Sequence, residues 1–415
     1  MIENLESELI PHLKEAKEIH IAVALMNSYG LDTIEETIPE DCLRKYLVGI
    51  HLPTPPNILQ RLMESESRNS AKISSKVHVS HSNYHPKVYV IRKKDDQLIA
   101  FIGSANATRG GFKSNIEMTT SIEDQKRCKH LLSWFGKLFE QSSSLSQNFI
   151  DGYKTRYIRN KQLESAQRSN NEHFYQEHSE QANSTFVSET QFFTQSDFDA
   201  FAPSTHFETD GPFVDARGQV RRKMINLHYA IFPQFVDYGM MNIYPARRKQ
   251  DYTSKHYHSQ GIFNAKESIW FNYGKDRQGF TNHLRIQIIL MNSERDQYVG
   301  FWIFCKPNSS IEDRQRLQTG LSNHIFLDRL YKGLLSLGDF SWIAIGDDDR
   351  WISDIKDKED LIEFLRSDDF SQEFLIGRNY HPNHPDISAE NIYETTLIQF
   401  SKLYKIYSLM TENVN

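Results

Sequence analysis

Residues that could carry out chemistry on a phosphodiester are concentrated between positions 85 and 117 of this 415-residue sequence. His85 and Lys87 are separated by one residue and lead into an apolar run, Val88–Ile91, so both side chains point to one face of a predicted strand. A neutral imidazole can attack phosphorus and form a phospho-histidine intermediate. An ammonium beside it can stabilise the charge that develops on the phosphoryl oxygens. The pair therefore indicates nucleophilic catalysis that needs neither a metal ion nor a cofactor.

A second predicted strand, residues 98–102, delivers further polar groups. It ends in Gly103, Ser104, Ala105 and Asn106, and the alternation places Ser104 and Asn106 where they can donate hydrogen bonds to phosphoryl oxygens. Glu117 is expected to bind the other ring nitrogen of His85 and to fix its tautomer. A second imidazole is still required, because the leaving oxygen must be protonated and a water molecule activated.

The complete pattern, H-x-K followed by G-S-x-N and N-x-E, resembles the HKD signature of the phospholipase D superfamily. The resemblance covers about residues 1–141 and adds Gly103 and Asn115 as residues of the substrate site, although Asn115 could equally orient the turn that carries Glu117. One position departs from the family pattern, because Arg92 stands where the family has an aspartate.

The resemblance also has a consequence for assembly. In this family the active site is built from two copies of the motif related by a two-fold axis, and the sequence contains one H-x-K followed by G-S-x-N. A homodimer through the N-terminal domain is implied, in which one His85 attacks and the His85 of the second copy acts as the acid.

The elements that must position these residues follow from the apolar pattern. Helices alternate with strands before the motif, and a helix with an apolar stripe follows it, starting at an Asp124 cap. This alternation favours an α/β domain with a mixed sheet covered by helices. The expected helices are 4–17, 31–38, 58–65 and 124–141, and the expected strands are 18–25, 44–52, 76–80, 88–91, 98–102 and one ending near 122.

Beyond this domain the composition changes twice. Residues 142–221 are rich in Ser, Gln, Asn and Glu and are predicted to form a linker arm with a helix at 149–168. Residues 222–415 are predicted to form an α+β, β-rich domain, to which we assign nucleic-acid recognition. Its expected strands are 268–273, 283–291 and 298–305, and its expected helices are 311–319, 326–337, 357–367 and 392–410.

Positive charge is concentrated at the start of that second domain. Between residues 217 and 285 there are twelve Arg and Lys against four Asp and Glu, interleaved with aromatic residues, although the whole chain has a net charge of −6. Such a mixture suits salt links to phosphate and stacking on bases, so Arg247, Arg248 and Lys249 are predicted to bind the substrate. A hydrated face of a β-rich domain is the alternative.

No metal site is predicted. Three adjacent acids, Asp347–Asp349, cannot converge on one ion from a regular element. A zinc site drawn from His256 and His258, completed either by Cys305 or by His381 and His384, lacks the paired-cysteine spacing. Three widely spaced cysteines, the lack of a signal peptide and the lack of any apolar run of about 20 residues predict a cytoplasmic protein away from the membrane.

Three functions remain open after these observations. The leading one is a metal-independent DNA endonuclease of restriction or anti-phage defence, because the pattern is similar to bacterial restriction endonucleases of the same superfamily. RNA as the substrate is left open, and so is a partner subunit such as an ATPase/helicase or a methyltransferase. The alternatives are a phospholipid or other phosphodiester hydrolase and a non-catalytic, dimeric scaffold that senses nucleic acid in defence.

Overall fold

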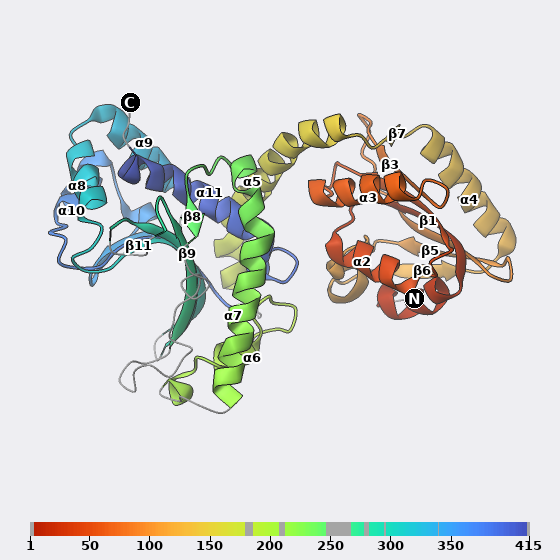
Figure 1. The fold of residues 1–415 in the computed structure, drawn as a ribbon, viewed down its shortest axis with the longest axis horizontal. Helices are drawn as coiled ribbons and strands as arrows, with labels where there is room; N and C mark the ends of the chain where they lie inside the picture. The colour runs from red at the N-terminus through yellow and green to blue at the C-terminus, as the bar shows by residue number, and fades with distance from the viewer. Residues whose placement is uncertain are drawn as a thin grey trace. The chain divides into compact units, whose positions relative to one another are not determined.

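The computed structural model describes residues 4–178, 186–206, 212–245, 267–277, 282–293, 296–338 and 340–412. The chain divides into two compact units, Met1–Lys161 and Gln162–Asn415 (Figure 1). Within the described ranges, every helix is too short or too polar to span a lipid bilayer.

The N-terminal unit is built on a seven-stranded mixed sheet with the strand order β6-β5-β4-β1-β2-β3-β7. Strands β1, β2 and β3 run parallel, whereas β4, β5, β6 and β7 join their neighbours in antiparallel pairs. The strands are β1 (Ala16–Val23), β2 (Leu43–Gly49), β3 (Ile73–His78), β4 (Lys87–Lys93), β5 (Leu98–Gly103), β6 (Thr119–Ile122) and β7 (Ser143–Ser144). The helices are α1 (Leu5–Lys14), α2 (Ser28–Thr37), α3 (Pro56–Arg68), α4 (Gln125–Glu140) and the start of α5 (Gln147–His178), with a π-helical turn at Gly110–Ser114.

Both faces of this sheet are covered, because the central strands bury side chains in both directions. Ile19 and Ile21 of β1 join a core with α1, α2, α3 and α5, while Ala22 joins a second core with Cys128 and Phe135 of α4. Asp124 caps α4 by accepting a hydrogen bond from Arg127 N at 2.8 Å, as its sequence position predicts. The prediction of an α/β domain with a mixed sheet covered by helices is confirmed.

A charged cluster ties β1 to β4 away from the H-x-K end of the strand. Glu18 lies 3.0 Å from Arg92 Nε and 2.8 Å from His20 Nε2. Contact with the His20 ring, followed by the Arg92 guanidinium, lowers the pKa of Glu18 to about 2 although burial opposes the shift. Arg92, at the position of the family aspartate, is therefore one half of an ion pair.

The Glu18→Gln variant should make the N-terminal unit less stable at neutral pH, by on the order of 3 kcal/mol. Because the pKa of Glu18 is depressed from 4.5 to about 2, the carboxylate contributes its stability above pH 4.5 and loses it as the pH falls toward 2. Urea unfolding at neutral pH and at about pH 3 measures both effects. At about pH 3 the carboxylate keeps only part of its contribution, so the loss should be clearly smaller there than at neutral pH. Asp96→Asn, which removes an exposed ion pair with Lys17, is the control and should change little. An equal loss at both pH values would contradict the prediction.

The C-terminal unit contains a seven-stranded sheet in which every neighbouring pair is antiparallel, with the order β13-β12-β14-β11-β10-β9-β8. An α+β, β-rich second domain is confirmed. The strands are β8 (Tyr244–Pro245), β9 (Ser268–Gly274), β10 (Arg285–Asn292), β11 (Gln297–Cys305), β12 (Ser341–Ile345), β13 (Asp348–Trp351) and β14 (Phe374–Tyr380). The helices are α6 (Gln195–Asp199), α7 (Pro212–Ile231), α8 (Ile311–Gly320), α9 (His324–Leu335), α10 (Lys358–Arg366) and α11 (Ile392–Thr411).

The division into units does not coincide with the predicted domain boundaries after residues 141 and 221. Strand β7 extends the N-terminal sheet, and Ile150, Tyr153 and Tyr157 of α5 are buried in its core. On the C-terminal side, Phe198 of α6 and Val220 of α7 are also buried. The predicted arm therefore contributes structure to both units, because its few apolar residues recur at helical spacing within a polar composition.

Candidate active site

Several strand ends meet at one edge of the N-terminal sheet. Strand β4 begins at Lys87, opposite Val23 at the end of β1, and Gly103 at the end of β5 lies opposite Thr119 at the start of β6. Antiparallel pairing brings the start of one strand beside the end of the next. The segments that hold His85, Ser104–Asn106 and Asn115–Glu117 consequently leave the sheet at this edge.

The His85 imidazole is exposed and rests against a buried lysine. Lys87 Nζ lies 2.8 Å from Nδ1 and 3.0 Å from Nε2 of the ring, and it donates to the His85 carbonyl at 3.1 Å. Lys87 itself is only 5% exposed. Burial lowers the pKa of the Lys87 ammonium, while the negative charge of Glu117 opposes this shift. The site thus presents a reachable imidazole to solvent and keeps a cation directly behind it.

Glu117 is held by two neighbours from its own edge of the sheet. Its carboxylate accepts hydrogen bonds from the Ser104 hydroxyl and, at 3.2 Å, from Asn115 Nδ2. The Ser104 hydroxyl oxygen in turn accepts a hydrogen bond of 2.9 Å from the backbone N–H of Met118. The predicted bond from Glu117 to the His85 ring is not made among the described residues, because the carboxylate is turned toward Ser104. Asn115 thus contacts the Glu117 carboxylate, while substrate binding and orientation of the turn that carries Glu117 both stay predictions for this residue.

Asn106 is anchored through one end of its amide. Its Oδ1 accepts a hydrogen bond of 3.1 Å from the backbone N–H of Leu25, in the segment after β1. The Nδ2 group therefore remains as the hydrogen-bond donor for a substrate oxygen. Ser104, by contrast, has its one proton directed at Glu117. Gly103 has a packing role, because a Cβ at this position would lie 2.2 Å from the Met118 carbonyl oxygen.

His51 is a positioning residue that the sequence reading missed. Its Nε2 lies 3.0 Å from the Ser80 carbonyl oxygen, and its Nδ1 accepts a hydrogen bond of 3.4 Å from the backbone N–H of Tyr84. The Tyr84 hydroxyl donates to the Leu47 carbonyl at 3.1 Å, and its ring stacks on His78. These contacts hold the chain that leads into His85. A lone histidine after a buried strand carries no signal that would have identified this role.

Several other residues named in the sequence analysis fall in parts of the chain that the structure does not describe. Arg247, Arg248 and Lys249 lie outside the described residues, as do His256 and His258. Across the parts of the chain that the structure describes, no three His, Cys, Asp or Glu residues are arranged to hold a metal ion. Asp348 and Asp349 belong to strand β13.

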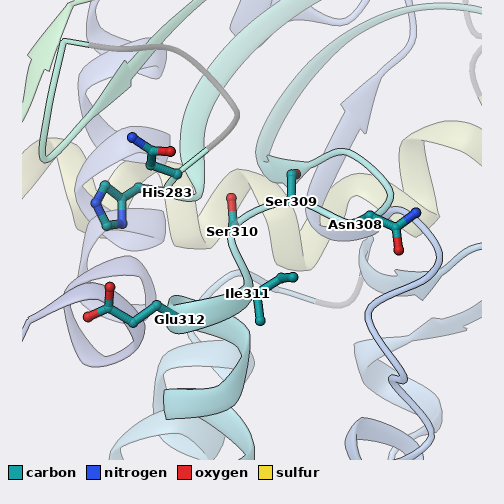
Figure 2. A pocket seen from close by; sticks show the side chains of 7 residues that line it. His283, Asn308, Ser309, Ser310, Ile311 and Glu312 are labelled. Carbon is teal, nitrogen blue, oxygen red and sulfur yellow. The ribbon is translucent and has the colours of Figure 1, made fainter.

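A pocket of about 410 Å³ is present in the C-terminal unit and contains none of the predicted site residues (Figure 2). His283 extends into it beside the start of α8, with Nδ1 3.2 Å from the fully buried carboxylate of Asp313. Lys275 Nζ lies 3.3 Å from the same carboxylate. The charge of Asp313 is thus balanced within the cluster. The lining residues are Asn282, His283, Asn308, Ser309, Ser310, Ile311 and Glu312.

Comparison with known proteins identifies the family to which the N-terminal unit is similar. Residues 7–139 match the family described as "Cardiolipin synthase, PLD-like domain". No curated protein matches the chain.

Three solved structures illustrate the similarity. NucT from Helicobacter pylori is 19% identical, over 33% of this chain and 89% of that one, with a TM-score of 0.26. Nuc from Salmonella typhimurium, a phospholipase D family member, is 15% identical over 33% and 88%, with a TM-score of 0.28. The archaeal chromatin protein TrmBL2, whose structure is described as showing a novel mode of DNA binding, is 18% identical over 34% and 51%, with a TM-score of 0.25.

Proposed function

We propose that the phospholipase D-like N-terminal unit is a metal-independent endonuclease that hydrolyses DNA in restriction or anti-phage defence. The observation that carries this proposal is the exposed His85 ring resting on buried Lys87, 2.8 Å from Nδ1, at a sheet edge that also holds Asn106 and Glu117. A nucleophile, a cation and a fixed amide donor are the groups that phosphoryl transfer through a covalent intermediate requires.

The reaction proceeds in two displacements. In the first, a ring nitrogen of His85 forms a bond to phosphorus, and the bond to the leaving oxygen breaks as that oxygen takes a proton from a second imidazole. In the second, water attacks phosphorus, gives its proton to the second imidazole and releases His85. Lys87 and Asn106 Nδ2 stabilise the charge on the non-bridging oxygens in both steps.

A second copy of the chain supplies that second imidazole. The apolar side chains that flank Glu117 support this assembly, since Ile116 is fully exposed and Met118 is 62% exposed. Apolar side chains that stand in water beside a polar site are typical of a surface that a partner covers. We therefore place the two-fold interface of the homodimer at this edge.

The Ile116→Asp variant should be monomeric and should lose nuclease activity. At a two-fold interface the substitution places two buried carboxylates, one from each subunit, near each other, and this disfavours the dimer. Light scattering after size-exclusion chromatography measures the mass, and plasmid nicking measures the activity. Leu43→Asp is the matched control, since Leu43 is 42% exposed but lies at the start of β2, at the opposite edge of the sheet. A dimeric and active Ile116→Asp variant would place the interface elsewhere.

Incubation of the protein with supercoiled plasmid in excess chelator tests the proposed function. Nicking or linearisation under these conditions supports it. Inertness toward DNA together with release of a phospholipid head group would support the lipid-hydrolase alternative. Inertness toward both substrates with retained binding to DNA would support the scaffold alternative.

A further inference from the structure

The sheet of the C-terminal unit has two different faces. One face packs against helices, where Phe400 of α11 contacts Tyr273 and Phe301 at ring distances of 5.7 and 6.0 Å. The opposite face forms a separate cluster of mainly aromatic side chains. Within the described residues, every member of that cluster comes from a strand: Trp270, Ile289, Met291, Tyr298, Trp302, Phe304, Trp342, Ala344 and Leu375. We call this surface the tryptophan face.

Trp302 lies flat at the centre of the tryptophan face. A Cβ added to Gly377 would lie 2.3 Å from Cδ1 of the indole, and one added to Gly300 would lie 2.7 Å from its Nε1. The two glycines therefore let the ring rest directly on the backbone of the sheet. Its Nε1 donates to Asn379 Oδ1 at 2.8 Å, which fixes the plane of the ring. The half-buried rings of Tyr298 and Trp342 stand 5.7 and 6.2 Å from it.

Two buried amides lie in the same cross-strand row as Trp302. Gln287 pairs with Asn272 on one side and with Trp302 on the other, so the three side chains share the tryptophan face. Gln287 is 2% and Asn272 is 4% exposed, and among the described residues neither Gln287 Oε1 nor Asn272 Oδ1 has a hydrogen-bond partner. Side chains that cover the two oxygens must move aside before a ligand reaches them. Buried amides without partners make folding less favourable, so their presence in an apolar, aromatic surface calls for a ligand that satisfies them.

We propose that the tryptophan face binds a nucleobase. A base has a flat π-surface that stacks on aromatic rings and an edge of alternating donors and acceptors that matches a side-chain amide. A half-turn of an amide group exchanges its oxygen and nitrogen, so Gln287 and Asn272 can present either atom to that edge. This inference depends on the proposed function in one respect: the base is taken to belong to the DNA strand on which the N-terminal unit acts.

The chemistry of the tryptophan face favours a base over other occupants. A lipid chain would cover the rings but would leave both amides unpaired. A phosphate group would find only Arg285 as a cation among the described residues of this face, and Arg285 is fully buried and already paired with Asp276. A planar heterocycle satisfies the rings and the amides together.

Binding of single-stranded DNA of about 12 nucleotides to the full-length His85→Ala variant tests the site without cleavage. Fluorescence anisotropy of the labelled strand and quenching of the tryptophan emission report binding. Adding Gln287→Leu to His85→Ala should weaken binding by about tenfold, the effect of losing one hydrogen-bonded contact to a base. The same substitution should leave unfolding by urea unchanged or shift it to higher urea, because it removes an unpaired buried amide.

Gln399→Leu is the matched control. Gln399 is also 2% exposed, but its Nε2 donates to the Tyr380 hydroxyl at 2.8 Å. This substitution should lower stability and leave binding unchanged.

Two results would overturn the inference: DNA binding that is insensitive to Gln287→Leu, as expected if the chain's own residues occupy the face, or a loss of stability in Gln287→Leu as large as that in Gln399→Leu. Binding that depends on Gln287 in a protein that does not cleave plasmid would support the site while the proposed function fails.

Discussion

His85→Ala should reduce the rate of DNA cleavage by on the order of 10⁴-fold or more, because it removes the atom that bonds to phosphorus. The initial rate of plasmid nicking in excess chelator measures the loss. Stability should change little, since the His85 ring is exposed and its hydrogen-bond contact among the described residues is with Lys87 Nζ. His81→Ala is the matched control, because His81 is also exposed and belongs to the same segment before β4. Activity within a few-fold of the parent protein would show that His85 is not the nucleophile.

The same variant also tests whether one active site needs two chains. When His85→Ala subunits are mixed with parent subunits and allowed to exchange, each mixed dimer has only one His85. The reaction needs two, one to attack phosphorus and one to protonate the leaving oxygen. Mixed dimers should be inactive, so the activity should fall with the square of the parent fraction. A linear fall, with the parent subunits unaffected by their partners, would mean that each chain carries a complete site.

Asn106→Asp should reduce the cleavage rate by about 10²- to 10³-fold. The substitution retains an oxygen that can accept Leu25 N but replaces the donor Nδ2 with a negatively charged oxygen facing the phosphate. The local structure should therefore be kept while stabilisation of the phosphoryl oxygens is lost. Initial rates under chelating conditions, combined with urea unfolding, separate the two effects.

Asn106→Ala is the companion variant because it removes the anchor as well as the donor. It should lose activity and also some stability, since Leu25 N is then left without its acceptor. If Asn106→Asp retained activity while Asn106→Ala lost it, Asn106 would be a structural anchor only. If both variants kept full activity, the amide would have no part in the reaction.

The sequence by itself determined the class of both domains and suggested the chemistry that we propose for the site. The pattern H-x-K followed by G-S-x-N is visible in the linear sequence. Because successive side chains of a strand point to opposite faces, the sequence also shows which residues of a strand share a face. The helix and strand periods before the motif likewise predict an α/β domain, and His85 and Lys87 do lie together at a strand end. Composition was a weaker guide at residues 142–221, where a polar sequence suggested a linker arm but Ile150, Tyr153 and Tyr157 of α5 are buried in the N-terminal core.

Only the tertiary structure decided which side chains meet across the sheet. Glu117 is directed at Ser104 and Asn115, Asn106 is anchored on Leu25, and His51 holds the segment before His85. Strand register decided these contacts. The row that joins Asn272, Gln287 and Trp302 likewise depends on how three strands are aligned, and a shift of one residue would turn each side chain to the other face. Local spacing carries the chemistry of a motif, but contacts between residues far apart in the chain arise only when the strands pair.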